Sequence, residues 1–460
     1  MMSYFGRFNY NYMSKYLLEM NLRYDGSSKF RPENRWDFFY GFSGGWRLSE
    51  EEFMKNVKFV NELKLRLSYG VVGNQSGISR YDGMQLYNFN SVNGAYIGDG
   101  RISYIKTSGE IATMGRSWER IHNYNLGLDF HLFDSRLQGT VELFMKKNNN
   151  MLIAVAYPGI LGDKAPASNS GKFEAKGYEG TVTWSDKIGK VNYHVGGTFT
   201  YADNKLVDYG GVTVFKSGFV DKQQGYSLNS VFGLKYCGKI QTEEQLRKYI
   251  YKYYNSNGIG MPKDLRLGDN MYEDVNGDGK LDEKDYVYLG SDDPKISYSF
   301  NVGIEWNNFD LSAVFQGTAK RTIFRDESND NYRIPMRAAH LNSTTQSVGN
   351  VWSPDNRDGR YPTYTNISTI NNYNYQCSSW SVENGNYLRL KSLTLGYNFP
   401  ASLLSKTKAI SRLRIYVSGA DLWEVSKIND GWDPEASRKV SGNGRFPFNR
   451  TCTVGLDVTF

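Results

Sequence analysis

The last seven residues of the chain, 454–460, alternate apolar side chains with small or polar ones and end on an aromatic residue. The apolar positions are Val454, Leu456, Val458 and Phe460. This pattern is typical of the closing strand of an outer-membrane β-barrel, with one face toward lipid and the other toward the lumen, and we expect these residues to be its assembly signal. Taken alone, the segment also fits a half-buried terminal strand of a soluble β-protein.

The same alternation recurs along the chain in thirteen segments. In one of them Leu63, Leu65 and Leu67 share a face, while Lys64 and Arg66 lie between them. Each segment is about ten residues long or longer, which is the length that a tilted strand needs to cross a bilayer. The sequence therefore predicts an all-β fold, a transmembrane antiparallel β-barrel or part of one.

The connections between these segments alternate in length. Short ones are expected at 13–15, 133–136, 186–190 and 307–308, and long ones at 26–35, 74–116, 204–293 and 326–383. Short periplasmic turns at one rim and long extracellular loops at the other are typical of a bacterial outer-membrane barrel.

Two local departures from simple alternation are also predicted. Leu388 and Leu390 are out of phase with Leu393, which indicates a β-bulge near Lys391-Ser392. Residues 242–254 open with Thr-x-x-Gln, which indicates a capping box and a short helix inside a long loop.

Composition excludes several classes of function. No run of 18 apolar residues exists, which excludes transmembrane helices. The net charge is +7 with interspersed signs, so nucleic-acid binding is not indicated. The three cysteines lack CxxC spacing, and no Ser-His-Asp or His-x-x-x-His arrangement indicates an enzyme. The first residues lack the basic and apolar regions of a signal peptide, so we interpret the chain as part of a longer exported protein.

Several motifs resemble those of the SusC-like (RagA-like) TonB-dependent outer-membrane transporters of Bacteroidetes. They occur in the order of that family: NLRYDGSSKFRPENRW, GWRLSEEEF, LKLRLSYGVVGNQ, NYNLGLDF with SRLQGTVELFMKKNNNML, YEDVNGDGKLDEKD and NYLRLKSLTLGYNFP. The resemblance implies a 22-stranded barrel filled by an N-terminal plug. Residues 1–460 would be the C-terminal portion of that barrel, with about thirteen strands, and the plug, TonB box and signal peptide would lie outside this chain.

One loop motif, residues 274–285, has the ligand spacing of a twelve-residue calcium loop. Its ligand positions are Asp274, Asn276, Asp278, Lys280 (through its carbonyl), Asp282 and Asp285, with Gly279 at the sharp turn. Asp285 replaces the usual glutamate at the last position. The motif predicts Ca²⁺ as a cofactor that stiffens a long loop. The alternative is an acidic turn held by hydrogen bonds alone.

Aromatic residues crowd the expected outer loops. The candidates for ligand or partner contact are Tyr361, Tyr364, Trp380, Trp423 and Trp432. Flat rings beside polar residues stack on sugars, but they serve equally as contacts for a lid protein or as packing within the loops.

These observations favour a function in the outer membrane. The resemblance implies active import of glycans, oligosaccharides or similarly bulky nutrients, driven by TonB-ExbB-ExbD through the missing N-terminal part. It also implies a SusD-like surface lipoprotein as partner, besides the barrel assembly machinery and outer-membrane lipid. Two alternatives are a surface-exposed binding or adhesion barrel without a transport cycle, and a soluble β-rich binding protein.

Overall fold

The computed structural model describes residues 1–81, 84, 86–97, 100–108, 115–154, 167–210, 218–220, 223–253, 262, 264–324, 345, 347–405, 409–428, 432–435 and 449–460. The chain divides into two compact units. The first comprises Met1–Ser185 with two short later segments, and the second comprises most of the remaining chain up to Phe460.

Thirteen strands form one sheet in the order β1-β2-β3-β4-β7-β8-β9-β10-β16-β17-β20-β21-β22, which confirms the predicted number. Among the described residues, β1 and β22 are the two edge strands of this sheet. The strands are β1 (Met2–Tyr12), β2 (Tyr16–Gly26), β3 (Trp36–Arg47), β4 (Val60–Asn74), β7 (Glu119–Leu132), β8 (Leu137–Ala154), β9 (Ala167–Ile188), β10 (Val191–Asp208), β16 (Ile296–Trp306), β17 (Phe309–Ala319), β20 (Tyr387–Asn398), β21 (Arg412–Ser426) and β22 (Thr451–Thr459).

The connections hold shorter elements. The strands are β5 (Leu86–Ile97), β6 (Gly100–Ser108), β11 (Gly218–Val220), β12 (Ser230–Gly233), β13 (Tyr236–Lys239), β14 (Asn270–Tyr272), β15 (Val287–Ser291), β18 (Thr322–Phe324) and β19 (Val382–Asn384). The helices are α1 (Glu243–Tyr253), α2 (Ser368–Asn374), α3 (Ala401–Leu404) and the 3₁₀ turns η1 (Pro32–Asn34), η2 (Leu48–Glu50), η3 (Glu52–Met54) and η5 (Glu283–Asp285). None of the helices in the described residues has the length and apolarity needed to span a bilayer.

Strand pairing places the alternating side chains on two different faces. Between β4 and β7, Leu67 lies opposite Leu126, whereas Lys64 lies opposite Asp129. Leu67 is 65% exposed and Leu126 is 41% exposed. One face of the sheet therefore presents large apolar side chains outward, and the other face carries the polar ones, as the sequence pattern predicts.

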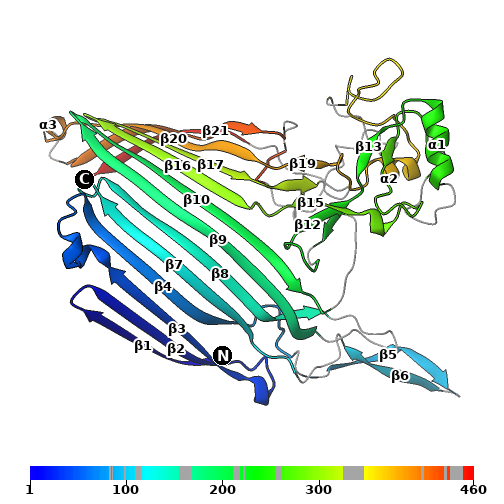
Figure 1. The fold of residues 1–460 in the computed structure, drawn as a ribbon, viewed down its shortest axis with the longest axis horizontal. Coiled ribbons are helices and arrows are strands. Elements are labelled where there is room, and N and C mark those ends of the chain that lie inside the picture. The colour runs from blue at the N-terminus through cyan, green and yellow to red at the C-terminus, as the bar shows by residue number, and fades with distance from the viewer. Residues whose placement is uncertain are drawn as a thin grey trace. The chain divides into compact units, whose positions relative to one another are not determined.

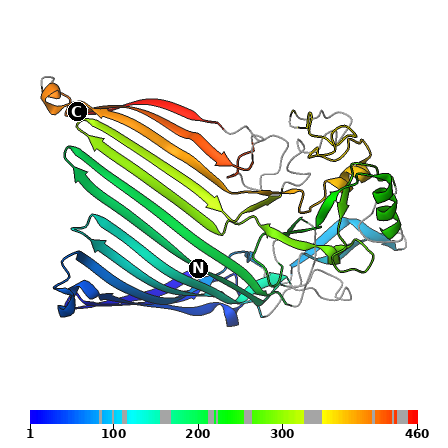
Figure 2. The ribbon, with the colours of Figure 1, turned by 45° about the horizontal axis from the view of Figure 1, so that its top comes forward.

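Most connections alternate between short and long along the sheet, but residues 48–59 between β3 and β4 form a longer connection than residues 27–35 between β2 and β3. β1 and β2, β7 and β8, β9 and β10, and β16 and β17 are joined by tight turns, while residues 209–295 and 320–386 are long. In the second unit, the turn between β16 and β17 lies at one end of these strands, and α1, α2 and β13 lie together beyond the other (Figures 1 and 2). At that turn Asn307 adopts a φ of 53°, a left-handed conformation that asparagine tolerates better than most residues.

The two predicted local features are present. In the pairing of β20 with β17, the consecutive residues Phe315 and Val314 lie opposite Leu390 and Ser392, so Lys391 is the extra residue of a bulge. Helix α1 begins next to Thr242, whose side chain accepts a hydrogen bond from the Gln245 backbone N–H at 3.2 Å. The Gln245 side chain accepts from the Gln241 backbone instead of closing the predicted box on Thr242.

Buried apolar residues gather mainly outside the long sheet. In the second unit a core forms among the loop elements, from Leu234, Ile240, Tyr249, Tyr253, Leu265, Tyr272, Leu281 and Tyr373. In the first unit a smaller cluster forms from Phe30, Phe39, Val71, Ile78 and Trp118. The long loops are therefore folded structures with their own interior.

Candidate functional site

The loop core of the second unit joins two segments that are far apart in the sequence. Asn374, at the end of α2, donates to Asp269 Oδ1 at 2.8 Å and accepts from the backbone N–H of Asn270 at 2.8 Å. Asp269, Asn270 and Asn374 are all fully buried. Because burial of the Asp269 carboxyl outweighs its hydrogen bonds, its pKa is raised. These polar contacts fix one loop against the other, since an unpaired group here would carry its full desolvation cost.

Three tyrosines complete this junction. The hydroxyls of Tyr249 on α1 and Tyr373 on α2 are 2.7 Å apart, and Tyr249 also accepts from the Tyr272 backbone N–H at 2.8 Å. Burial raises the pKa of Tyr249 and of Tyr272. Their hydroxyls therefore stay neutral hydrogen-bonding groups, suited to structure and unsuited to proton transfer near neutral pH.

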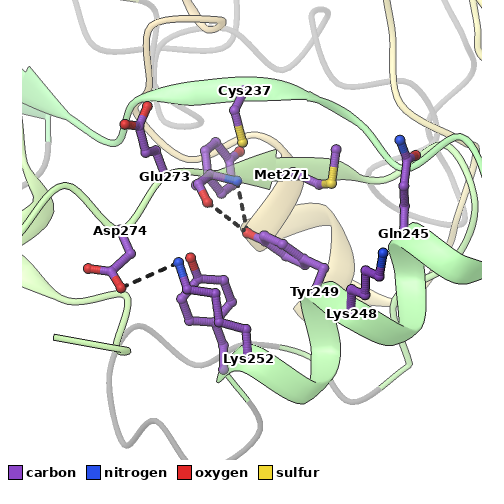
Figure 3. A pocket seen from close by; sticks show the side chains of 10 residues that line it. Cys237, Gln245, Lys248, Tyr249, Lys252, Met271, Glu273 and Asp274 are labelled. Carbon is purple, nitrogen blue, oxygen red and sulfur yellow. Dashed lines mark hydrogen bonds and ion pairs between the residues drawn. The ribbon is translucent and has the colours of Figure 1, made fainter. Parts of the chain in front are cut away.

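A pocket of about 330 Å³ opens between α1 and the β13–β14 pair (Figure 3). Lys252 reaches across it to Asp274, with Nζ 3.6 Å from Oδ2, and its ammonium lies 4.9 Å from the Tyr253 ring centre. The lining residues are Cys237, Gln245, Lys248, Tyr249, Lys252, Tyr253, Met271, Tyr272, Glu273 and Asp274. Desolvation raises the pKa of the Cys237 thiol, which keeps it protonated and a weak nucleophile.

The predicted calcium loop is a compact acidic turn beside this pocket. Asp274 accepts from the backbone N–H of Gly277 at 2.7 Å and of Gly279 at 2.9 Å. At the far end of the loop, the buried Asp285 carboxylate accepts from Val275 at 2.9 Å and from Asp282 at 2.9 Å. Asp282 in turn caps η5. The first and last acidic positions therefore close the turn through the backbone.

The remaining predicted ligands of this loop also contact the backbone. Asn276 accepts from Asp278, and Asp278 accepts from the N–H of Lys280. Within the described residues, no three His, Cys, Asp or Glu side chains converge in a way that could hold a metal ion. Each carboxylate oxygen keeps a second lone pair when it accepts one hydrogen bond, so these contacts leave acceptor capacity. Calcium binding stays a prediction.

The predicted contact aromatics do not form one surface. Tyr361 is 6% exposed, and Trp380 packs near it with ring centres 6.5 Å apart. Tyr364 is 37% exposed and its hydroxyl donates to Ser347. Trp423 lies elsewhere, on the apolar side of β21, with its ring against Phe315. Trp432 lies in a separate short segment, 432–435. The structure thus brings Tyr361 and Trp380 together, and their role as ligand or partner contacts stays a prediction.

The polar face of the sheet carries ion pairs between strands. Arg66 on β4 binds Asp129 on β7 through two hydrogen bonds of 2.8 and 3.0 Å, and its Nη2 lies 3.4 Å from Glu142 on β8. Arg414 on β21 joins Asp310 on β17 at 2.6 Å and Asp457 on β22 at 3.2 Å. On this face, Asp129, Asp310 and Asp457 are therefore each paired with an arginine.

One ionic cluster was not anticipated from the sequence. Arg389 on β20 is fully buried and contacts Glu424 on β21 as well as Asp433 and Glu435 of the segment 432–435. Alternation along β20 places Arg389 on the polar face. However, Asp433 lies 44 positions away, and no local spacing links the two.

Residues 2–282 match the family model described as TonB dependent receptor-like, beta-barrel. The chain belongs to this family. Members of this family of TonB-dependent receptors are outer-membrane proteins. The match covers more than half of the chain and includes strands β1 to β4 and β7 to β10 of the sheet.

Individual relatives agree with this family. The chain is 29% identical over 487 residues to TonB-dependent receptor P26 of Formosa agariphila, with 100% of this chain and 46% of the relative covered. It is 25% identical over 473 residues to TonB-dependent receptor SusC of Bacteroides thetaiotaomicron, with 100% and 44% covered. The chain thus spans about half the length of the curated relatives it matches.

The fold is similar to that of a solved transporter. The structure titled "Structure of the RagAB peptide transporter" superimposes with a TM-score of 0.79 at 24% identity, covering 100% of this chain and 47% of that chain. This likeness concerns the fold, and the chain matches about half of that structure.

Proposed function

We propose that this chain forms about half of an outer-membrane, TonB-dependent importer of glycans or similarly bulky nutrients. The observation that carries the proposal is the match of residues 2–282 to the TonB-dependent receptor barrel. In this proposal, the remaining length of the protein supplies the other strands, the plug and the contact with TonB-ExbB-ExbD. The chain itself supplies part of the barrel wall and its loops, and β22 carries the residues proposed as the signal for the barrel assembly machinery.

The physical character of the sheet supports this function. A surface that exposes Leu67, Val417 and Leu395 to more than half of their area would be costly in water but is stable against lipid. The opposite face carries paired charges such as Arg66 with Asp129, which require water or polar contacts. A wall with these two faces separates lipid from an aqueous passage.

Two similarities suggest different cargo classes. The resemblance of the sequence motifs to SusC-like transporters implies glycans, whereas a fold neighbour is named as a peptide transporter. We propose glycans as the first cargo class to test, with peptides as the alternative. The folded loop core favours a SusD-like surface lipoprotein as partner, because it offers a rigid platform in the long loops, built on buried contacts such as Asn374 with Asp269.

The proposed import function is tested by measuring uptake in cells that make the complete protein. Fluorescent oligosaccharides and oligopeptides of similar size are supplied to wild-type and deletion strains, with and without a protonophore. We expect accumulation of one class that is lost on deletion and on collapse of the proton gradient. Surface binding that persists without energy, with no accumulation, would instead identify an adhesion barrel.

The partner is tested separately. An affinity tag is placed outside residues 1–460 of the complete protein, and mild detergent extraction precedes mass spectrometry. We expect a lipoprotein in near-equal amount with the barrel. Recovery of the barrel alone from membranes that still import the cargo would contradict a SusD-like partner.

A further inference from the structure

A short segment, Trp432–Glu435, is bound to the polar face of the sheet by three cationic side chains. Asp433 Oδ1 lies 2.7 Å from Arg389 Nη2, and Glu435 Oε2 lies 3.0 Å from Lys391 Nζ. The Arg321 guanidinium donates to the carbonyl of Pro434 and also pairs with Asp292 at 3.0 Å. The segment therefore reaches from β20 to the residues that follow β17.

Arg389 is the centre of these contacts. Its side chain is 0% exposed, and it pairs with Glu424 on the neighbouring strand as well as with both carboxylates of the segment. Lys391, the bulged residue of β20, adds a second cation to the same cluster. A buried arginine needs carboxylate partners, because an uncompensated charge away from water is strongly unfavourable.

The charges of the cluster do not balance when the segment is docked. The two cations Arg389 and Lys391 face four carboxylates: Asp421, Glu424, Asp433 and Glu435. Among the described residues, the formal sum of these charges is −2 with the segment docked and zero without it, because the two strand carboxylates already match the two cations. Docking is thus attractive at its contacts but opposed by the excess of negative charge.

A second arginine on the polar face shows what the strands alone provide. Arg66 takes its partners from strands of the sheet, Asp129 from the adjacent β7 and Glu142 from β8 beyond it, and its side chain is 35% exposed. Arg389 takes part of its partners from a connection between β21 and β22, and is closed off from solvent. Of these two arginines, Arg389 is therefore the one that is paired with carboxylates from a loop.

We propose that Trp432–Glu435 is an ionic latch, which docks reversibly on Arg389, Lys391 and Arg321 and covers the polar face at the long-loop ends of β17 and β20. The opposed attractions and repulsions keep the docked and released forms close in free energy. The proposal goes beyond the proposed function, which assigns that same face to the aqueous passage, and release would uncover it to an incoming molecule.

The latch is tested by limited trypsin digestion of intact cells that carry the complete protein. Arg438 and Lys439, which lie outside the described residues, follow the latch directly in sequence. Cleavage there is measured by mass spectrometry relative to cleavage after Lys248, an exposed residue of α1. Because cleavage tracks the population of the open form when opening is fast, latch release should raise its rate.

The decisive variant is Arg389→Met, with Arg66→Met as its matched control. Arg389→Met leaves four carboxylates with one cation and should speed cleavage at 438–439 about tenfold, since proteolysis follows the released fraction. Arg66→Met removes a similar charge from the polar face with no latch partner and should leave that rate within about twofold. Equal rates in wild type and both variants, or an equal increase in both variants, would overturn the latch.

A loop variant covers the case in which Arg389→Met does not enter the membrane. Glu435→Lys places a cation 3.0 Å from Lys391 without changing the strands, so it should also speed cleavage. The double variant Glu435→Lys with Lys391→Glu should regain part of the protection from trypsin, because the ion pair is restored with its charges exchanged. Glu435→Lys cleaved at the wild-type rate would overturn the proposal. Digestion is independent of import, so this result stands apart from the uptake experiment.

Discussion

The wall and the loop core of this chain place their apolar side chains in opposite ways. On the wall, Leu67 is 65% exposed and Val417 is 53% exposed, although both lie in regular strands. In the loop core, Leu234 and Ile370 are 1% and 0% exposed. The proposed function explains this contrast, because an outward apolar face suits contact with lipid, whereas loops in water bury their apolar groups. The proposed function thus places two regions of one chain in different solvents, and the experiments below distinguish the two regions.

The largest difference is expected for a charge placed on the apolar face. Leu126→Arg should destabilise the wall by about 2–4 kcal/mol, because an arginine near the bilayer midplane loses its hydration. The matched control is Tyr251→Arg on α1, where the side chain is 89% exposed and a charge meets water. Heat-modifiable migration of the membrane-extracted protein measures assembly. Normal migration of both variants would contradict the claim that the apolar face of the sheet and the exposed face of α1 have different surroundings.

Calcium should act on the loops alone. If the 274–285 turn binds Ca²⁺, a concentration about 100 times the dissociation constant adds about 2.7 kcal/mol to the stability of the folded loop. Protection of α1 from proteolysis should rise with calcium, while heat-modifiable migration of the wall stays the same. Asp278→Ala should abolish the response, with Glu244→Gln on the exposed face of α1 as control. A response that survives Asp278→Ala would contradict the calcium prediction.

Removing one methylene group should matter in the loop core more than on the wall. Ile370→Val should cost the loop about 0.5–1.5 kcal/mol, because the buried space is not refilled. Leu126→Val should cost the wall less, since lipid fills the gap beside an exposed side chain. Hydrogen exchange of α2 amides in the first variant, and of β7 amides in the second, measures the two effects. Equal costs would show that the wall is packed like a globular interior.

The smallest effect concerns acid. Desolvation of Asp274 is outweighed by hydrogen bonds from Gly279 and Gly277, so the pKa of this carboxyl is lowered in the folded loop. A lowered pKa means that its stabilisation is complete above the unfolded value of about 3.9 and is lost as pH falls through the folded value. Protease protection of α1 should therefore fall below about pH 4, and less so in Asp274→Asn. Identical acid profiles for the two would remove Asp274 from this role.

Local patterns predicted the wall well. The period-two alternation located the strands because a strand with two different faces imposes it on every residue, as in Leu63, Leu65 and Leu67. The bulge at Lys391 followed from a change of phase, and α1 followed from Thr242 and the helical run after it. Each of these features depends on neighbours in sequence.

Long-range contacts could not be predicted in the same way. Asn270 contacts Asn374 across 104 positions, and Arg389 contacts Asp433 across 44, so no local sequence spacing predicts either pair. The aromatic residues illustrate the same difficulty. From the sequence, Tyr361 and Trp423 are both aromatic candidates for ligand or partner contact. In the structure, Tyr361 is buried in a loop, whereas Trp423 lies on the apolar side of a strand.

Site-directed spin labelling along β7 tests the central claim most directly. Single labels at successive positions from Tyr124 to Phe130 are introduced into the complete protein in liposomes, with Cys237, Cys377 and Cys452 replaced by serine. Collisions with oxygen, which partitions into lipid, should peak at 124, 126, 128 and 130, and collisions with a water-soluble nickel chelate should not. Nickel access equal at all positions, or low oxygen access at the apolar ones, would contradict a wall between lipid and water.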